Sequence, residues 1–269
     1  MLRASIVAVC LCGLVSAPAC RNETHRSGVV ASASASAGAP PAAALVHFVI
    51  EAPSSKLTLH MDSPLEKISG EAPGAVEGEL EVDLNDITRS SGLVKVSLER
   101  LVLYQEKRSD EKHDYSARQK NDAENKDARE WLQLEAREGE IAAEQAERNR
   151  FPQFRIERLE KASASSVAAL SGATREVGAT ARGELLLHGR RNKKSVNVAL
   201  RFEYSGDQLQ SLSARTSEPF KIALEDYDIH PRSKAGKMLK TIGEALAGPL
   251  GKKVAEEASI ELEFTARPK

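Results

Sequence analysis

Apolar and polar residues alternate with a period of two over most of the chain beyond residue 45. The clearest example is the segment 195–204, SVNVALRFEY, in which Val196, Val198, Leu200 and Phe202 occupy every second position. Successive side chains of a β-strand point to opposite faces of a sheet, so this spacing predicts a strand with one buried and one solvated face. A chain built mainly of such segments has to cover the apolar face of many strands.

The same alternation recurs in a series of other short segments. They are residues 46–50, 57–61, 76–84, 94–98, 154–156, 181–187, 220–224 and 260–264. The apolar positions change phase near Arg100, and a β-bulge there would explain the change. Many long antiparallel strands leave unpaired edges, which closure into a barrel removes. We therefore expect an all-β fold, an antiparallel β-barrel over residues 46–269, with helical insertions.

Two segments break the alternation and predict those insertions. Residues 116–150 are rich in charge and in good helix formers, with Trp131 as an apolar anchor and Gly139 as a break between helices. This segment is either a solvated excursion or a partner-binding helix. Residues 234–258 have apolar positions at helical spacing beside three lysines. They predict a helix that caps the barrel, closes over it as a lid, or touches a membrane.

The N-terminal residues have the features of an export signal. Residues 1–19 combine Arg3, an apolar run and the small residues Ala17-Pro18-Ala19, which is typical of a secretory signal peptide. Cys20 follows directly, so the site resembles a bacterial lipoprotein signal in which this cysteine is lipidated. Residues 20–45 are mostly small or polar and predict a disordered tether. We expect a protein of the bacterial cell envelope, in the periplasm and anchored to a membrane through Cys20.

Composition and motifs argue against several function classes. The net charge is −1 and aromatic residues make up 4% of the chain, so neither phosphate neutralisation nor base stacking is favoured and no nucleic-acid partner is expected. The common nucleophile, metalloprotease and phosphate-loop motifs are missing, and residues 46–269 contain no cysteine. We predict no catalytic residue, no metal and no cofactor. One alternative remains open, an enzyme in which Asp226, Asp228 and His230 converge in a pocket.

A barrel with an apolar lining can bind a ligand without any catalyst. Each CH2 group moved from water into such a lining contributes about 0.8 kcal/mol. A tail with about a dozen buried carbons therefore offsets a large cost of association. The chain is predicted to bind a hydrophobic small molecule.

Several segments, in their order along the chain, resemble the YceI-like family. The central motif is Gly183-Glu184-Leu185-Leu186-Leu187-His188-Gly189, followed by a basic turn and a valine-rich strand. The other segments are Gly78–Asp83, Gly92–Leu98, Arg129–Leu132 and Phe151–Phe154. The resemblance implies a lipocalin-like antiparallel barrel that encloses a polyisoprenoid or a fatty ligand.

The inward positions of the strands are the predicted binding residues. We expect the barrel lining to include Leu80, Val82, Val96, Leu98, Leu185, Leu187, Val196, Val198, Leu200, Phe202, Phe220 and Ile222. Arg190, Arg191, Lys193 and Lys194 are predicted to form a solvated turn between two strands. The alternative function is a structural or interaction protein of the envelope, whose barrel is filled by its own side chains and whose helices bind a partner. The oligomeric state, the ligand and the lipidation of Cys20 stay open.

Overall fold

The computed structural model describes residues 45–231 and 255–269. The chain divides into residues 1–40 and 41–269, and every described residue belongs to the second unit. The predicted signal peptide, the tether up to residue 44 and most of the predicted helical insertion 234–258 lie outside the described residues. The prediction extends this helical insertion too far at its C-terminal boundary, because Glu257 and Ala258 already belong to the last strand.

Eight antiparallel strands pair in a closed ring, which confirms the predicted barrel. In their spatial order they are β1 (Leu45–Ile50), β4 (Val76–Asp83), β5 (Ser91–Val96), β8 (Gln153–Glu160), β9 (Thr174–Leu187), β10 (Arg190–Ser205), β11 (Gln208–Thr216) and β13 (Glu257–Pro268). The ring closes where β13 pairs with β1, with Phe48 opposite Pro268 and Ile50 opposite Ala266. Closure gives every ring strand two partners and removes the free edges.

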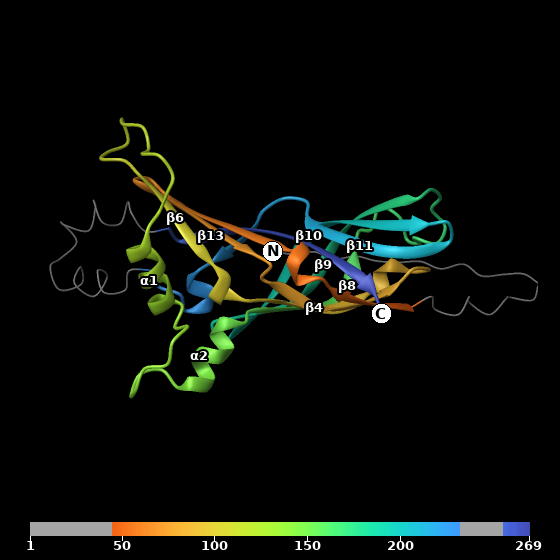
Figure 1. The fold of residues 1–269 in the computed structure, drawn as a ribbon, viewed down its shortest axis with the longest axis horizontal. Coiled ribbons are helices and arrows are strands. Elements are labelled where there is room, and N and C mark those ends of the chain that lie inside the picture. The colour runs from red at the N-terminus through yellow and green to blue at the C-terminus, as the bar shows by residue number, and fades with distance from the viewer. Residues whose placement is uncertain (1–44, 232–254) are drawn as a thin grey trace, which may run out of the picture. The chain divides into compact units, whose positions relative to one another are not determined.

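Further strands extend this sheet beyond the ring. They are β2 (Lys56–Ser63), β3 (Glu66–Pro73), β6 (Val102–Lys107), β7 (Gln119–Lys120) and β12 (Phe220–Ala223). Strand β13 joins the two parts, because its first half pairs with β12 and β2 and its second half pairs with β11 and β1. The long strand β13 thus runs through both parts of the sheet (Figure 1).

Short 3-10 helices connect several of the strands. They are η1 (Ala52–Ser54), η2 (Ile87–Arg89), η3 (Leu98–Arg100) and η4 (Glu225–Tyr227). The change of phase near Arg100 is produced by η3, not by the predicted bulge, because this turn ends β5 and starts β6 in a new phase.

Two helices lie in the predicted insertion 116–150: α1 (Asp122–Trp131) and α2 (Ala143–Arg150). The side chain of Asn121 caps α1 by accepting hydrogen bonds from the amides of Ala123 and Glu124. Asn125 of α1 is hydrogen bonded to both backbone groups of Leu103, which holds α1 against β6 (Figure 1). Neither of the two described helices is long and apolar enough to cross a membrane.

Strands β9 and β10 form the longest hairpin of the described chain. His188 and Gly189 make its two-residue turn, with φ angles of 50° and 75°. Two successive positive φ angles are typical of the type I′ turn that matches the twist of paired strands. The four basic residues predicted to form the turn lie instead in β10, because pairing of the two strands starts at Arg190 opposite Leu187.

The buried apolar residues form two clusters along the barrel. The first contains, among others, Phe48, Ile50, Ile87, Val167, Val177, Phe202 and Ala266, and we call the region of these seven residues the packed end. The second also contains residues of α1 and of the strands outside the ring. Its members include Leu57, Leu59, Leu103, Leu132, Leu185, Ile222, Tyr227 and Ile260. Both clusters use the inward positions that the alternation predicts.

Candidate functional site

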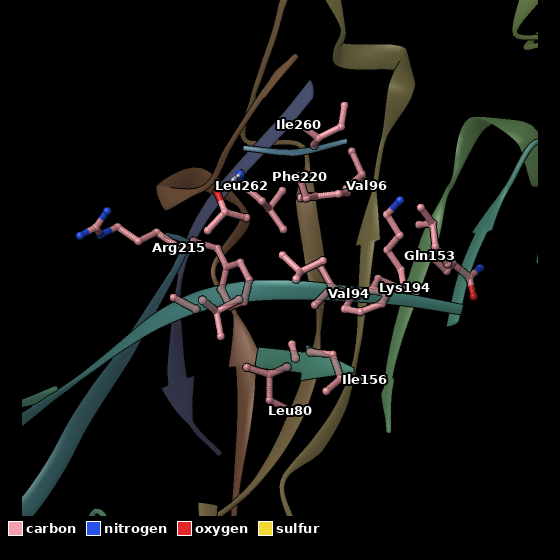
Figure 2. Close-up of a pocket in the computed structure, with 18 of the residues that line it drawn as sticks. Leu80, Val94, Val96, Gln153, Ile156, Lys194, Arg215, Phe220, Ile260 and Leu262 are labelled. Carbon is pink, nitrogen blue, oxygen red and sulfur yellow. Dashed lines mark hydrogen bonds between the residues drawn. The ribbon is translucent and has the colours of Figure 1, made fainter. Parts of the chain in front are cut away.

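A cavity of about 180 Å³ lies inside the barrel, with walls that draw on both core clusters. In Figure 2 the labelled side chains Leu80, Val94 and Ile156 approach it from one side and Phe220, Ile260 and Leu262 from the other. We call this region the hollow end. Its wall reaches the surface, because the exposed Arg215 and the half-buried Lys194 are part of it.

The alternation of the strands accounts for the apolar wall. On β10 the inward row is Lys194, Val196, Val198 and Leu200, and each of these residues lines the cavity. The outward neighbours Ser195 and Asn197 are exposed, as a period of two requires. One strand therefore supplies an apolar inner face with a single charged residue near its start.

Gly183 of β9 permits a close approach between two wall strands. A Cβ atom at this position would lie 1.9 Å from the carbonyl oxygen of Arg155 on β8. Gly78 of β4 is in the same situation, with Leu93 O at 1.9 Å and a φ of +144°. Both residues belong to the glycine motifs that carry the family resemblance. These motifs thus mark places where the barrel wall needs a residue without a side chain.

The structure places ten of the twelve predicted lining residues in the cavity wall. They are Leu80, Val82, Val96, Leu185, Leu187, Val196, Val198, Leu200, Phe220 and Ile222. The prediction is wrong for Leu98, which starts the turn η3 and packs against the second core cluster. It is also wrong for Phe202, which points inward but is 0% exposed within the packed end. Contact of the ten residues with a lipid stays a prediction.

Other wall residues were not predicted individually. They include Leu57, Val94, Phe154, Ile156, Leu159, Ala181, Ala214, Ile260, Leu262 and Phe264. Several lie in segments whose alternation was recognised, for example 154–156 and 260–264, so the same signal identifies them as inward. Ala181 also lies in such a segment, 181–187, whereas Ala214 carries no such signal, because alanine is common on both faces of a strand.

The polar residues of the wall differ in what their side chains do. The hydroxyl of Ser90 accepts a hydrogen bond from the amide of Asp83, and that of Thr216 accepts one from the amide of Leu262. These two hydroxyls serve the barrel itself. The wall contains two basic residues, Lys194 and Arg215, and no acidic residue in the part of the chain that the structure describes.

The residues of the alternative enzyme site do not converge in a pocket. Asp228 lies at the end of η4 with a φ of 56°, and its carboxylate contacts His230 at 3.0 Å and Arg190 at 3.5 Å. The side chains of Asp228 and His230 are 54% and 59% exposed. Both contacts hold the pKa of Asp228 below its usual value, the hydrogen bond from His230 being the larger cause. Asp226 is also exposed, so the predicted convergence is wrong.

No group of three potential metal ligands forms within residues 45–231 and 255–269. His188 lies in the β9–β10 turn and is half-buried. Its Nδ1 donates to the carbonyl oxygen of Tyr227 at 3.0 Å. Burial is the main reason that the pKa of His188 is lowered.

No family model matches the chain, and no curated protein matches it. One similar solved structure is a polyisoprenoid-binding domain from Saccharophagus degradans implicated in plant cell wall breakdown. It is 12% identical, with a TM-score of 0.48, and the match covers 84% of this chain and 99% of that domain. Another is BcnA from Burkholderia cenocepacia, which is 11% identical with a TM-score of 0.43 over 80% of this chain and 98% of BcnA.

At such identities and TM-scores, the fold assignment rests on the strand pairings of this chain. Those pairings close a ring of antiparallel strands around an apolar interior. The antiparallel barrel that the resemblance to the YceI-like family implies is therefore the fold of the described chain.

Proposed function

We propose that this protein binds an amphiphilic lipid, with the apolar tail inside the cavity at the hollow end of the barrel. The observation that carries the proposal is the wall of this cavity, which is made mainly of Leu, Val, Ile, Ala and Phe side chains. A concave apolar site with a few polar groups at its margin is the usual form of a small-molecule site. The ligand class is a polyisoprenoid or a fatty molecule, as expected from the sequence.

The size of the cavity limits how much of the ligand it holds. Its volume of about 180 Å³ is close to that of apolar cavities, roughly 150 Å³, that take up benzene in another protein. A tail segment of that size gains about 0.8 kcal/mol for each buried CH2 group. The end of the tail is therefore expected in the cavity, with the remainder of the lipid extending toward the surface beside Lys194 and Arg215.

A structural or partner-binding role is the second candidate. It is favoured by the packed end, where Phe48 and Phe202 are both 0% exposed and fill the barrel. In this case the cavity at the hollow end would be an unused packing defect. The lipid-binding candidate predicts that apolar molecules bind in the cavity, whereas the structural candidate predicts that they do not.

A pair of variants on β10 separates the two candidates. Val196→Phe places a larger side chain in the cavity, whereas Ser195→Phe adds the same ring to the exposed face of the same strand. The proposal predicts that dodecanol binds to the wild type and to Ser195→Phe, and at least about tenfold more weakly to Val196→Phe, measured by isothermal titration calorimetry. Equal affinity in all three proteins, or binding to none, supports the second candidate.

Native mass spectrometry identifies the natural ligand. Protein purified from its own host under non-denaturing conditions is expected to carry a lipid mass that is lost on denaturation. Protein that repeatedly carries no lipid, and takes up none when mixed with host lipid extract, would defeat the proposal.

We further propose that the protein works in the bacterial envelope, on the periplasmic side and anchored through an acylated Cys20. The support is the sequence of residues 1–20, with its apolar run and small residues before the cysteine. Membrane fractionation of the host tests this proposal. The wild type is expected in the membrane fraction and Cys20→Ser in the soluble fraction, and an identical distribution of the two would contradict the anchor.

A further inference from the structure

We propose that Lys194 binds an anionic head group, a phosphate or a carboxylate, of the lipid whose tail occupies the cavity. This inference rests on the proposed function and names the chemical class of its ligand. It starts from the four basic residues at the beginning of β10, which the sequence predicted as a turn.

Three of these four residues have an acidic partner on the outer surface. Arg190 contacts Asp228 at 3.5 Å, Arg191 contacts Glu184 at 2.7 Å, and Lys193 is paired with Glu157. The three basic residues of these pairs are all exposed to solvent. Their positive charges are therefore already matched by neighbouring carboxylates.

Lys194 differs from these three in direction and in pairing. It belongs to the inward row that continues with Val196 and Val198, it is half-buried, and it lines the cavity. No acidic residue lines this cavity, and Lys194 takes part in no ion pair among the described residues. The fourth basic residue thus brings a positive charge to an apolar wall.

Figure 2 distinguishes Lys194 from the other basic residue of the wall. Lys194 lies near Val96 and Gln153 within the group of lining side chains, whereas the guanidinium of Arg215 is directed away from the other labelled residues. Arg215 is also exposed, on the outward face of β11. The ammonium group of Lys194 is therefore the cation that a ligand in the cavity can reach.

Lys194 and an anionic head group have complementary charges at the boundary between the apolar cavity and solvent. Next to an apolar wall the effective dielectric constant is lower than in bulk water, so a ligand anion gains more from a cation there than from a fully solvated charge. Hydrogen bonds to charged groups contribute about 1.5–3 kcal/mol, which corresponds to roughly tenfold in affinity or more. A neutral head group of the same size lacks this contribution.

Three probes test the inference: dodecyl phosphate, dodecanol and inorganic phosphate, each titrated into the protein by calorimetry below the micelle concentration. Dodecyl phosphate is expected to bind about tenfold more tightly than dodecanol to the wild type. Lys194→Met should abolish this preference, and Lys194→Arg should retain most of it. Lys193→Met, the adjacent outward lysine, serves as the matched control and should keep the full preference.

The outcomes separate this inference from the proposed function. Binding of both lipids with no preference in the wild type, or with a preference that Lys194→Met keeps, overturns the role of Lys194 and leaves lipid binding intact. Failure of both lipids to bind overturns the proposed function and this inference with it. Inorganic phosphate that binds as tightly as dodecyl phosphate also contradicts the inference, because the tail would then contribute nothing. Circular dichroism of each variant shows that it is folded.

Discussion

The two ends of the barrel are built from the same kind of strand but have different interiors. At the packed end, Phe48 and Phe202 are fully buried, and Val167 from the loop 161–173 is fully buried in the same cluster. At the hollow end, Val196, Val198 and Leu185 face a cavity of about 180 Å³.

The difference shows that inward alternation and a filled core are separate properties. The same row of β10 contributes Val198 to the hollow end and Phe202 to the packed end. What changes along the row is the size of the side chain and the presence of a covering loop. That loop is held by hydrogen bonds from Ala168 N to Leu84 O and from Ile87 N to Ser165 O.

The largest expected effect comes from a deletion at the packed end. Phe202→Ala should lower the free energy of unfolding by about 3–5 kcal/mol, because the ring is fully buried and its neighbours cannot collapse into the space. Urea denaturation measures this loss, and dodecanol affinity should stay within about twofold of the wild type. A loss below about 1 kcal/mol would mean that this end is not packed as described.

A glycine pair on β9 tests how closely the wall strands approach. Gly183→Ala should cost about 2–3 kcal/mol, because its Cβ would lie 1.9 Å from Arg155 O. A Cβ atom at Gly178 on the same strand would have no atom within 4 Å. Gly178→Ala should therefore be neutral or stabilise the protein by up to about 1 kcal/mol. Equal effects of the two variants in thermal denaturation would contradict the close approach.

A pair of identical substitutions compares the two ends directly. Val177→Ala at the packed end should cost about 2–3 kcal/mol, whereas Val196→Ala at the hollow end should cost about 1 kcal/mol. Val177 is enclosed on all sides, while Val196 already faces empty space and has fewer contacts to lose. Urea denaturation of both variants measures the two losses in free energy of unfolding. A larger loss for Val196→Ala than for Val177→Ala would reverse the assignment of the two ends.

The smallest expected effect is a pH dependence of stability caused by His188 in the β9–β10 turn. Burial lowers the pKa of His188, so the unfolded chain takes up this proton at a higher pH than the folded chain. The contribution of His188 to the free energy of unfolding is therefore fully present above its pKa in the unfolded chain, about 6.5. This contribution decreases as the pH falls toward the lowered pKa of His188 in the folded protein. His188→Asn, which tolerates the positive φ, should lose less stability than the wild type between about pH 7 and about pH 5. Equal losses in urea denaturation would exclude this contribution.

The sequence predicted the barrel and most of its lining because both follow from the period of two. Val196, Val198 and Leu200 could be placed inward from their spacing alone. Phe202 could not be excluded from the cavity, because its position depends on what packs against it from distant segments such as the loop 161–173. Leu98 was misplaced because the change of phase near Arg100 was interpreted as a bulge within a strand, whereas the turn η3 begins at Leu98.

The basic cluster shows a second limit of the sequence. Arg190 through Lys194 were predicted as a solvated turn, since several adjacent charges usually are exposed. The turn is made instead by His188 and Gly189, and pairing of the strands puts Lys194 on the inner face. The register of the hairpin decides which one of four basic side chains faces the cavity, and composition carries no information about this register.

The most direct test of the central claim is a crystal structure of the complex with 12-bromododecanol, whose bromine marks the end of the apolar tail. The account predicts an anomalous bromine peak inside the barrel, among Leu80, Val94 and Leu200 at the hollow end. A peak confined to the outer surface, or a cavity that stays empty at saturating ligand, would contradict it.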